Sequence, residues 1–125
     1  FEIKNMKNYP NHYQEMCELV GDLQLEIPAT MKGFVAMHKS ACGEGALSSK
    51  TKELIALAIS IASRCDGCIA YHIHDAIKSG ADKKEIVEAI GVAILMGGGP
   101  SLMYGCEALA ALKQFTVEQE TSISN

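Results

Sequence analysis

Apolar residues recur every three or four positions along nearly the whole chain, and two segments are apolar on all sides. Strand-like alternation is almost absent, and the 125 residues include only three prolines. This periodicity predicts an all-α fold. A domain most often has roughly 100–150 residues, so we expect a single helical domain that spans residues 1–125.

Turn and cap signals divide the chain into about six helices. Ile27-Pro28 separates the first two, because the residue before a proline avoids the helical region. Ser48 or Ser49 can cap the third helix, and Asp82 with Glu85 three residues later predicts a capping box. We expect helices at about Pro10–Glu26, Pro28–Ala41, Ser49–Ser63, Asp66–Ser79, Asp82–Met96 and Pro100–Phe115, followed by a loose polar tail from Thr116 to Asn125.

The third helix from Leu54 onward and the second half of the fifth helix carry apolar residues all round. A helix of this kind is buried on most sides, and a small six-helix domain has few such positions. With 48% hydrophobic residues, the chain is a candidate for a homo-oligomer in which a partner subunit covers the second face. The alternative is a helix enclosed within the monomer.

Charge and cysteine content exclude several classes of protein. The net charge is −4 and no basic block occurs, which argues against nucleic acid as a partner. The longest strongly apolar run, Leu54 to Ala62, is shorter than the ~20 residues that span a membrane, and no signal peptide is visible. Five cysteines without a regular framework favour a reducing compartment. We therefore expect a cytoplasmic protein without a membrane partner.

The most informative segment has the pattern Cys65-x-x-Cys68-x-x-x-His72. With Asp66 as the expected N-cap, Cys68 lies in the first turn, where the positive end of the helix lowers a thiol pKa below its usual ~8.5. His72 is four residues after Cys68 and shares its helix face. Two neighbouring thiols and a base form a dithiol redox centre. This placement favours Cys68 as the attacking thiol and Cys65 as the resolving thiol, although the reverse order stays open.

Glu53 is the second candidate of interest, twelve residues before Cys65. It is the sole acid inside a helix that becomes apolar at the next residue. If that helix packs beside the fourth helix, this carboxylate can serve as a proton acceptor for the cysteine pair. The alternative is a solvated acid in the first helical turn.

These motifs resemble the AhpD-like alkylhydroperoxidase branch of the carboxymuconolactone decarboxylase superfamily, over a signature region of about residues 47–115. The spacing of Glu53, Cys65, Cys68 and His72 carries the resemblance. The further matching positions are Ala76, Gly80, Glu85-Ile86 and Gly97-Gly98-Gly99-Pro100.

The resemblance implies a catalytic set of Glu53, Cys65, Cys68 and His72, in which the cysteines cycle between dithiol and disulfide and the other two relay protons. It implies reduction of a small hydroperoxide or a disulfide, an external dithiol protein as electron donor, and no bound cofactor or metal. Members assemble as dimers, trimers or hexamers. Some members have a histidine at the position of Gly67; here a water or Tyr71 would complete the relay.

Other interpretations remain open. A zinc site on Cys65, Cys68 and His72 needs a fourth ligand, which only Cys42, Cys106, His38 or His74 could supply. The chain could also be a structural oligomer with an inactive cysteine pair, or a decarboxylase-like acid–base enzyme that uses Glu53 and His72. By default, His12 is expected in solvent, His38 as a buried or interface residue, and Cys17, Cys42 and Cys106 as small apolar residues.

Overall fold

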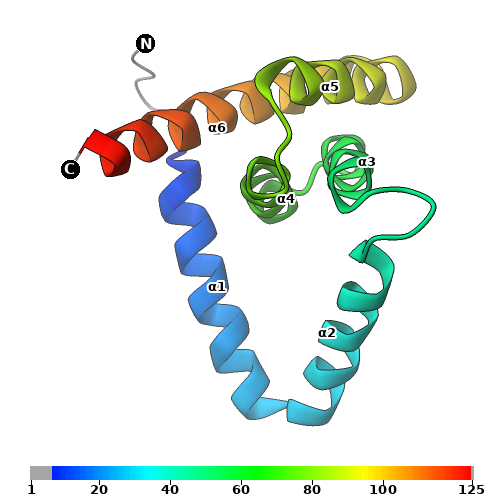
Figure 1. Cartoon of the computed structure of the whole chain (residues 1–125), viewed down its shortest axis with the longest axis vertical. Coiled ribbons are helices and arrows are strands. Elements are labelled where there is room, and N and C mark those ends of the chain that lie inside the picture. Colours follow the sequence, from blue (N-terminus) through cyan, green and yellow to red (C-terminus); the bar gives the residue numbers. More distant parts are fainter. Residues whose placement is uncertain (1–6, 125) are drawn as a thin grey trace.

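The computed structural model describes the backbone of residues 7–124 and the side chains of residues 7–117 and 119. Within this range the chain is all-α, which confirms the predicted fold class. The described residues form the helices α1 (Tyr9–Glu26), α2 (Pro28–Cys42), α3 (Ser49–Ala62), α4 (Asp66–Lys78), α5 (Lys83–Gly97) and α6 (Gly99–Ser124), which are labelled in Figure 1.

Local capping signals explain most of these boundaries. The Ser48 side chain accepts the Thr51 N–H at 3.1 Å and caps α3. Asp82 accepts the Glu85 N–H at 2.8 Å, and Glu85 accepts the Asp82 N–H at 3.0 Å, which confirms the predicted capping box at the start of α5. Each such cap satisfies backbone donors that the first helical turn leaves unpaired.

The predicted end of the last helix is wrong. Helix α6 continues beyond Phe115 as far as Ser124, through the segment expected to be a loose tail. No glycine or proline follows Gly105 in this helix, so nothing in the polar segment interrupts the backbone hydrogen bonds. Glutamate and glutamine are also good helix formers, and hydrophilic composition alone is therefore a poor stop signal.

The core lies where α3, α4, α5 and α6 pack against one another. Leu57, Ile61, Ile69, Ile73 and Ile86 are fully buried there. Complete burial of one such side chain contributes about 1.5–3 kcal/mol to stability. Since Ile69 and Ile73 lie on α4, the core holds this helix firmly beside α3. The two helices and the residue that precedes α4 include all four predicted catalytic residues.

Helix α1 is anchored to α6 by the fully buried Tyr9. Its hydroxyl donates to Glu107 Oε1 at 2.8 Å, and its backbone N–H donates to Gln114 Oε1 at 2.8 Å. Burial and the neighbouring Glu107 raise the pKa of the Tyr9 phenol far above its usual range. These contacts fix the start of α1 and, with it, the position of the helix beside the cysteine pair.

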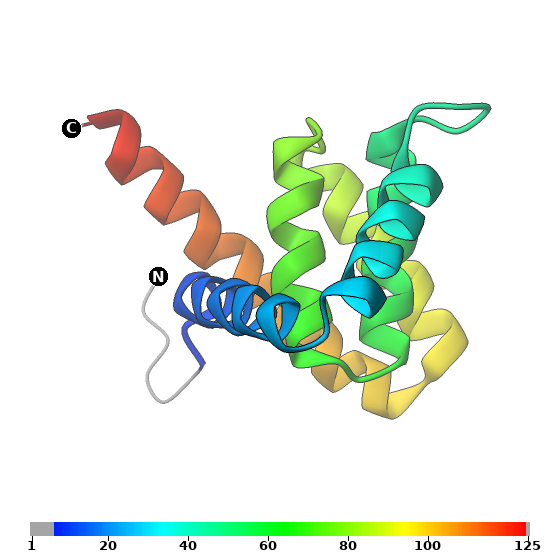
Figure 2. The same ribbon diagram turned by 90° about the horizontal axis from the view of Figure 1, so that it is seen from below.

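Helices α1 and α2 form a V whose apex is the turn at Ile27 (Figure 1). Helices α3 and α4 are seen almost end-on between its arms in Figure 1 and from the side in Figure 2. Helix α2 contains no buried residue. Several large apolar side chains are exposed on both arms and on α3 and α5: Leu19, Val20, Leu23, Leu25, Phe34, Val35, Met37, Ile59, Val92, Leu95 and Met96.

The glycine run between α5 and α6 forms a tight turn. Gly98 has φ +72°, which favours glycine, and a Cβ at Gly97 would lie 1.8 Å from the Ser101 Oγ. The Ser101 Cβ would lie 2.7 Å from that position, and the nearest atom of another residue is the Ala62 Cα at 3.8 Å. The glycines therefore serve the close packing of α6 against the end of α5.

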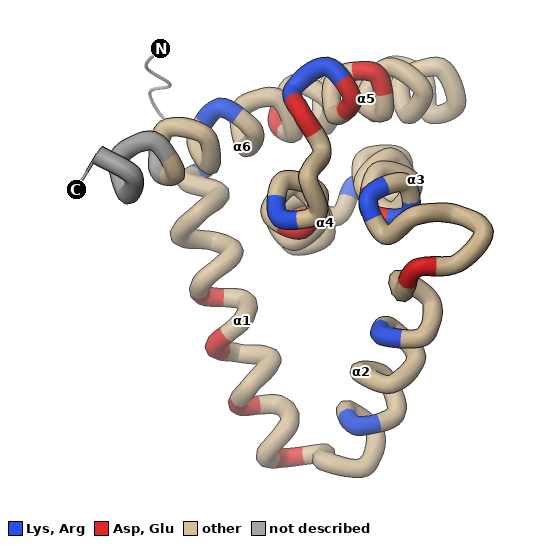
Figure 3. The backbone as a smooth tube through the Cα atoms, in the orientation of Figure 1, with Lys and Arg blue, Asp and Glu red and all other residues tan. Residues whose placement is uncertain are grey.

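Charged residues are distributed unevenly over the V (Figure 3). Helix α1 carries the acids Glu15, Glu18, Asp22 and Glu26, whereas α2 carries Lys32 and Lys39. Among the described residues, no helix combines the length and the apolar character required to cross a membrane.

Candidate active site

Cys65 and Cys68 lie at the start of α4 and are joined by a disulfide, with their Cα atoms 5.2 Å apart. Cys65 is the N-cap of the helix, and its Sγ accepts the Cys68 N–H at 3.2 Å. The prediction of Asp66 as the N-cap is therefore wrong. Cys65 has the extended backbone that an N-cap requires, and Asp66 is the first helical residue, with its carboxylate paired to Lys7.

This shift by one residue changes which sulfur the helix end stabilises. The Cys68 N–H in the first turn of α4 donates to the Cys65 Sγ, and a donor at the positive end of a helix stabilises a thiolate. The sequence-based preference for Cys68 as the ionised thiol rested on Asp66 as the cap. In the structure, the helix end favours the thiolate of Cys65.

The buried Glu53 of α3 holds the ring of His72 on α4. Glu53 Oε2 lies 2.8 Å from His72 Nδ1, and the two side chains are 5% and 18% exposed. This excludes the alternative of a solvated acid. A carboxylate only accepts hydrogen bonds, so Nδ1 carries the proton, and in the neutral ring Nε2 is left as the proton acceptor.

His72 lies one helical turn after Cys68, on the same face of α4. The structure therefore pairs Glu53 with His72 and Cys65 with Cys68. The two pairs lie at neighbouring positions along α4. A disulfide that can be reduced, a base beside it and a buried acid behind the base are the groups that proton-coupled thiol chemistry requires.

Helix α1 covers the glycine between the two cysteines. A Cβ at Gly67 would meet Met16 Cγ at 3.9 Å and His12 Nε2 at 4.0 Å. The expectation that His12 lies free in solvent is wrong, because it is partly buried and its ring contacts Tyr9 at a centroid distance of 6.4 Å. The absence of a side chain at position 67 leaves room for this second imidazole.

Two residues of α2 that the sequence analysis treated as ordinary packing residues lie beside Glu53. The Cys42 Sγ is 3.8 Å from His38 Nε2, and a carboxylate oxygen of Glu53 lies within 4.8 Å of both. Burial, followed by that carboxylate, raises the pKa of the Cys42 thiol. The spacing of four between His38 and Cys42 was the one sequence signal that could have drawn attention to them.

Tyr71 has a ring contact with each of the two groups of side chains, His38–Cys42 and Glu53–His72. Its ring lies edge-on to the rings of His38 and His72, at centroid distances of 5.9 and 5.4 Å. Burial, followed by Asp75, raises the pKa of its phenol. Tyr71 therefore stays protonated at neutral pH, and its hydroxyl can donate one hydrogen bond as well as accept one.

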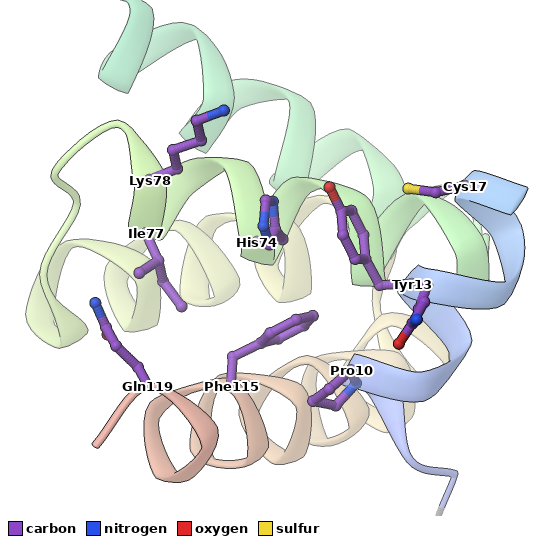
Figure 4. A pocket seen from close by; sticks show the side chains of 9 residues that line it. Pro10, Tyr13, Cys17, His74, Ile77, Lys78, Phe115 and Gln119 are labelled. Carbon is purple, nitrogen blue, oxygen red and sulfur yellow. The ribbon is translucent and has the colours of Figure 1, made fainter. Parts of the chain in front are cut away.

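A separate hollow of about 680 Å³ lies between α1, α4 and α6 (Figure 4). Its wall includes Tyr13, which stacks on His74 with centroids 4.1 Å apart, and Phe115. His74 is also 2.8 Å from Asp75 Oδ1. None of the four predicted catalytic residues lines this hollow, so it is distinct from the cysteine pair.

Solved structures of similar proteins share this fold. The apo form of a carboxymuconolactone decarboxylase family protein from Legionella pneumophila is 40% identical, with a TM-score of 0.83 over 86% of this chain and 96% of that one. A family protein from Thermotoga maritima, with a suggested involvement in antioxidative response, is 27% identical, with a TM-score of 0.80 over 88% of this chain and 94% of its own.

Two sequence relatives match about two thirds of this chain. An uncharacterised protein of Cupriavidus necator is 39% identical over 66% of this chain and 74% of its own length. A protein of Paracoccus denitrificans, known as uncharacterised protein 4 in the cox locus, is 38% identical over 65% and 73%. The model of the carboxymuconolactone decarboxylase family matches residues 28–111. The chain is therefore a member of the carboxymuconolactone decarboxylase family.

Proposed function

We propose that this protein is a thiol-dependent oxidoreductase of the alkylhydroperoxidase type, which reduces a small hydroperoxide or a partner's disulfide. One observation carries the proposal: the Cys65–Cys68 disulfide begins the same helix on which His72, held by the buried Glu53, follows one turn later. The suggested antioxidative role of the similar Thermotoga maritima protein supports the same chemistry.

In the first step, the Cys65 thiolate attacks the terminal oxygen of the hydroperoxide. The S–O bond forms as the O–O bond breaks, and the alkoxide takes a proton to leave as an alcohol. Cys65 becomes a sulfenic acid. The N-cap position assigns this role to Cys65, because the Cys68 N–H and the helix end stabilise the thiolate before attack.

In the second step, Cys68 resolves the sulfenic acid. His72 Nε2 accepts the Cys68 thiol proton, and Glu53 stabilises the imidazolium that forms. The Cys68 sulfur then bonds to the Cys65 sulfur, hydroxide leaves, and His72 returns the proton so that water is released. The product is the disulfide seen in the structure, which protects Cys65 from further oxidation.

Two electrons from an external dithiol protein complete the cycle. A donor thiolate attacks the disulfide, a mixed disulfide forms, and the donor's second thiol releases the reduced pair. This exchange requires no bound cofactor, and a dithiol donor is maintained in a reducing compartment such as the cytoplasm.

A single-turnover experiment tests the proposal. Reduced wild type, Cys65→Ser and Cys68→Ser proteins are each treated with one equivalent of an organic hydroperoxide and analysed by mass spectrometry. We expect the wild type to lose the mass of two hydrogen atoms as the disulfide forms. We expect Cys68→Ser to accumulate a sulfenic acid at Cys65, and Cys65→Ser to react slowly. Rapid sulfenic acid formation in Cys65→Ser would reverse the two roles.

The same variants separate this chemistry from acid–base catalysis by Glu53 and His72 alone. A thiol-dependent enzyme loses peroxide consumption, measured with a dithiol donor, when both cysteines are replaced by serine. Inert thiols in the wild type, with no peroxide consumed by any of several dithiol donors, would contradict the proposal as a whole.

We propose that the chain forms a homo-oligomer through the exposed apolar side chains on the V and on α5. Phe34 is 55% exposed and Leu95 is 78% exposed, and the acidic α1 and basic α2 offer complementary charges to a second copy (Figure 3). By light scattering we expect a mass above the 13.4 kDa of one chain. Phe34→Asp and Leu95→Asp should reduce it, whereas Lys84→Asp should not. A wild-type monomer would refute this assembly.

A further inference from the structure

Three side chains with metal-ligating atoms lie close together between α2 and α3. His38 and Cys42 come from α2, and Glu53 comes from α3. Their ligand atoms all lie within 4.8 Å of one another. Neither sulfur of the disulfide belongs to this cluster, so its ligands are present while the Cys65–Cys68 pair is oxidised.

The two ligands on α2 already have nearly the spacing of a zinc site. They are four residues apart and therefore share one helix face, and Cys42 Sγ lies 3.8 Å from His38 Nε2. In a tetrahedral site with Zn–S near 2.3 Å and Zn–N near 2.0–2.1 Å, the same two atoms are about 3.6 Å apart. Little movement of either side chain is needed.

Glu53 supplies the third ligand from a fixed position. Its carboxylate is 4% exposed, and Oε2 is held by His72 Nδ1 at 2.8 Å. Ligating carboxylates in metal sites are themselves held by such hydrogen bonds, which orient them toward the ion. The carboxylate therefore has His72 as a hydrogen-bond partner and a ligand oxygen within 4.8 Å of the two ligand atoms of α2.

We infer that His38, Cys42 and Glu53 bind a Zn²⁺ ion, with a fourth position open to water. One nitrogen, one sulfur and one oxygen match the ligands of zinc, whereas Mg²⁺ and Ca²⁺ take oxygen ligands. On binding, the Cys42 thiol releases its proton to solvent, and the sulfur ligates as a thiolate.

The ligand atoms must still move closer together, and helix α2 is the part of the fold that can make this movement. Separations of up to 4.8 Å must contract by about 1 Å to reach tetrahedral geometry. Helix α2 has no buried residue, so its last turn can approach Glu53 without disturbing the core. Lys52 and Asp75 place opposite charges near Cys42, and their effects on a cation oppose each other.

Zinc at this position would inhibit the proposed thiol chemistry, a consequence that rests on the proposed function. A carboxylate bound to Zn²⁺ has lost most of its capacity to stabilise the His72 imidazolium. Resolution by Cys68 then slows, and removal of zinc restores it. The site would make the activity sensitive to free zinc.

Binding is tested first on the oxidised, metal-free protein, so that the disulfide keeps Cys65 and Cys68 from ligating. Zn²⁺ is added in a calorimeter, and Co²⁺ is used as a spectroscopic probe of thiolate ligation. We expect one ion per chain, a thiolate-to-cobalt absorption band, and at least about a tenfold loss of affinity in Cys42→Ser and in His38→Ala. Cys106→Ser, a change at an exposed cysteine, is the matched control.

Absence of stoichiometric binding, or binding that Cys42→Ser leaves intact, would overturn the inference. The second measurement compares single-turnover resolution with and without zinc within each variant. Zinc should slow the wild type and the Cys106→Ser control but not Cys42→Ser. Equal inhibition of Cys42→Ser would place the metal on the reduced Cys65–Cys68 pair and refute this regulatory role. If no peroxide is reduced without metal, the proposed function fails while the binding result stands on its own.

Discussion

Replacement of Glu53 by glutamine removes one negative charge from the buried side of the site and changes little else. Glutamine has the size of glutamate and keeps an oxygen that can accept a hydrogen bond from His72 Nδ1. In the wild type this nitrogen lies 2.8 Å from the carboxylate oxygen. The variant therefore isolates the effect of charge on the imidazolium that forms when Cys68 loses its proton.

The expected magnitude follows from the burial of the pair. With only 5% of the Glu53 side chain exposed, water screens the interaction poorly. A hydrogen bond to a charged group contributes about 1.5–3 kcal/mol, and each 1.4 kcal/mol corresponds to about a tenfold change. Since the neutral hydrogen bond survives, we expect resolution of the sulfenic acid to slow by about 10- to 100-fold.

The assay is single-turnover disulfide formation in Glu53→Gln, followed by stopped flow after mixing reduced protein with hydroperoxide. Formation of the Cys65 sulfenic acid should be affected much less than its resolution, because the helix end stabilises that thiolate. Glu88→Gln, on the exposed side of α5, is the control. The buried amide should also reduce stability by about 1–3 kcal/mol, so both proteins are compared well below their unfolding temperatures.

A resolution rate for Glu53→Gln within about twofold of the control would refute the reasoning. It would mean that the charge on Glu53 does not stabilise the proton acceptor. Equal slowing of both steps would also count against the assigned roles, since it would indicate a general distortion of the site.

Two further predictions concern stability. Gly97→Ala forces a Cβ against Ser101 and should lower the free energy of unfolding in urea by about 1–3 kcal/mol. Gly91→Ala, where a Cβ would meet no atom within 4 Å, is the control and should not destabilise the fold. Equal stability of the two variants would disprove the close contact. The backbone N–H of Asp82 and the side chain of Lys50 lower the pKa of Glu85 below its ordinary value of 4.5. The ionised Glu85 therefore stabilises the fold above pH 4.5, and this stabilisation is lost as the pH falls through the lower folded-state pKa. The Tm of Glu85→Gln should lie below wild type at neutral pH, and the difference should shrink as the pH falls through the folded-state pKa.

Helical periodicity and local chemistry were enough to place most helices. Ser48, Asp82 and the Ile27-Pro28 step act within one turn of the chain, and the structure bears these signals out. Two local predictions were wrong for local reasons. Cys65 rather than Asp66 caps α4, because a sulfur can accept the Cys68 N–H, and α6 continues through a polar segment that contains no helix breaker.

The pairing of Glu53 with His72 could be proposed but not established from spacing, because it depends on α3 packing against α4 through residues such as Leu57 and Ile73. The approach of α2 was not foreseen at all. His38 and Cys42 are neighbours on one helix face, yet nothing in their own segment specifies that the face turns toward Glu53.

The order of residues alone was sufficient for the helices, the cysteine pair and the base one turn away, since these depend on contacts between residues a few positions apart. The tertiary fold decided whether Glu53 is buried or solvated, where His12 lies, and which side chains surround the carboxylate. Those outcomes depend on packing between helices that are distant in the chain, and the free energy of that packing is distributed over the whole core.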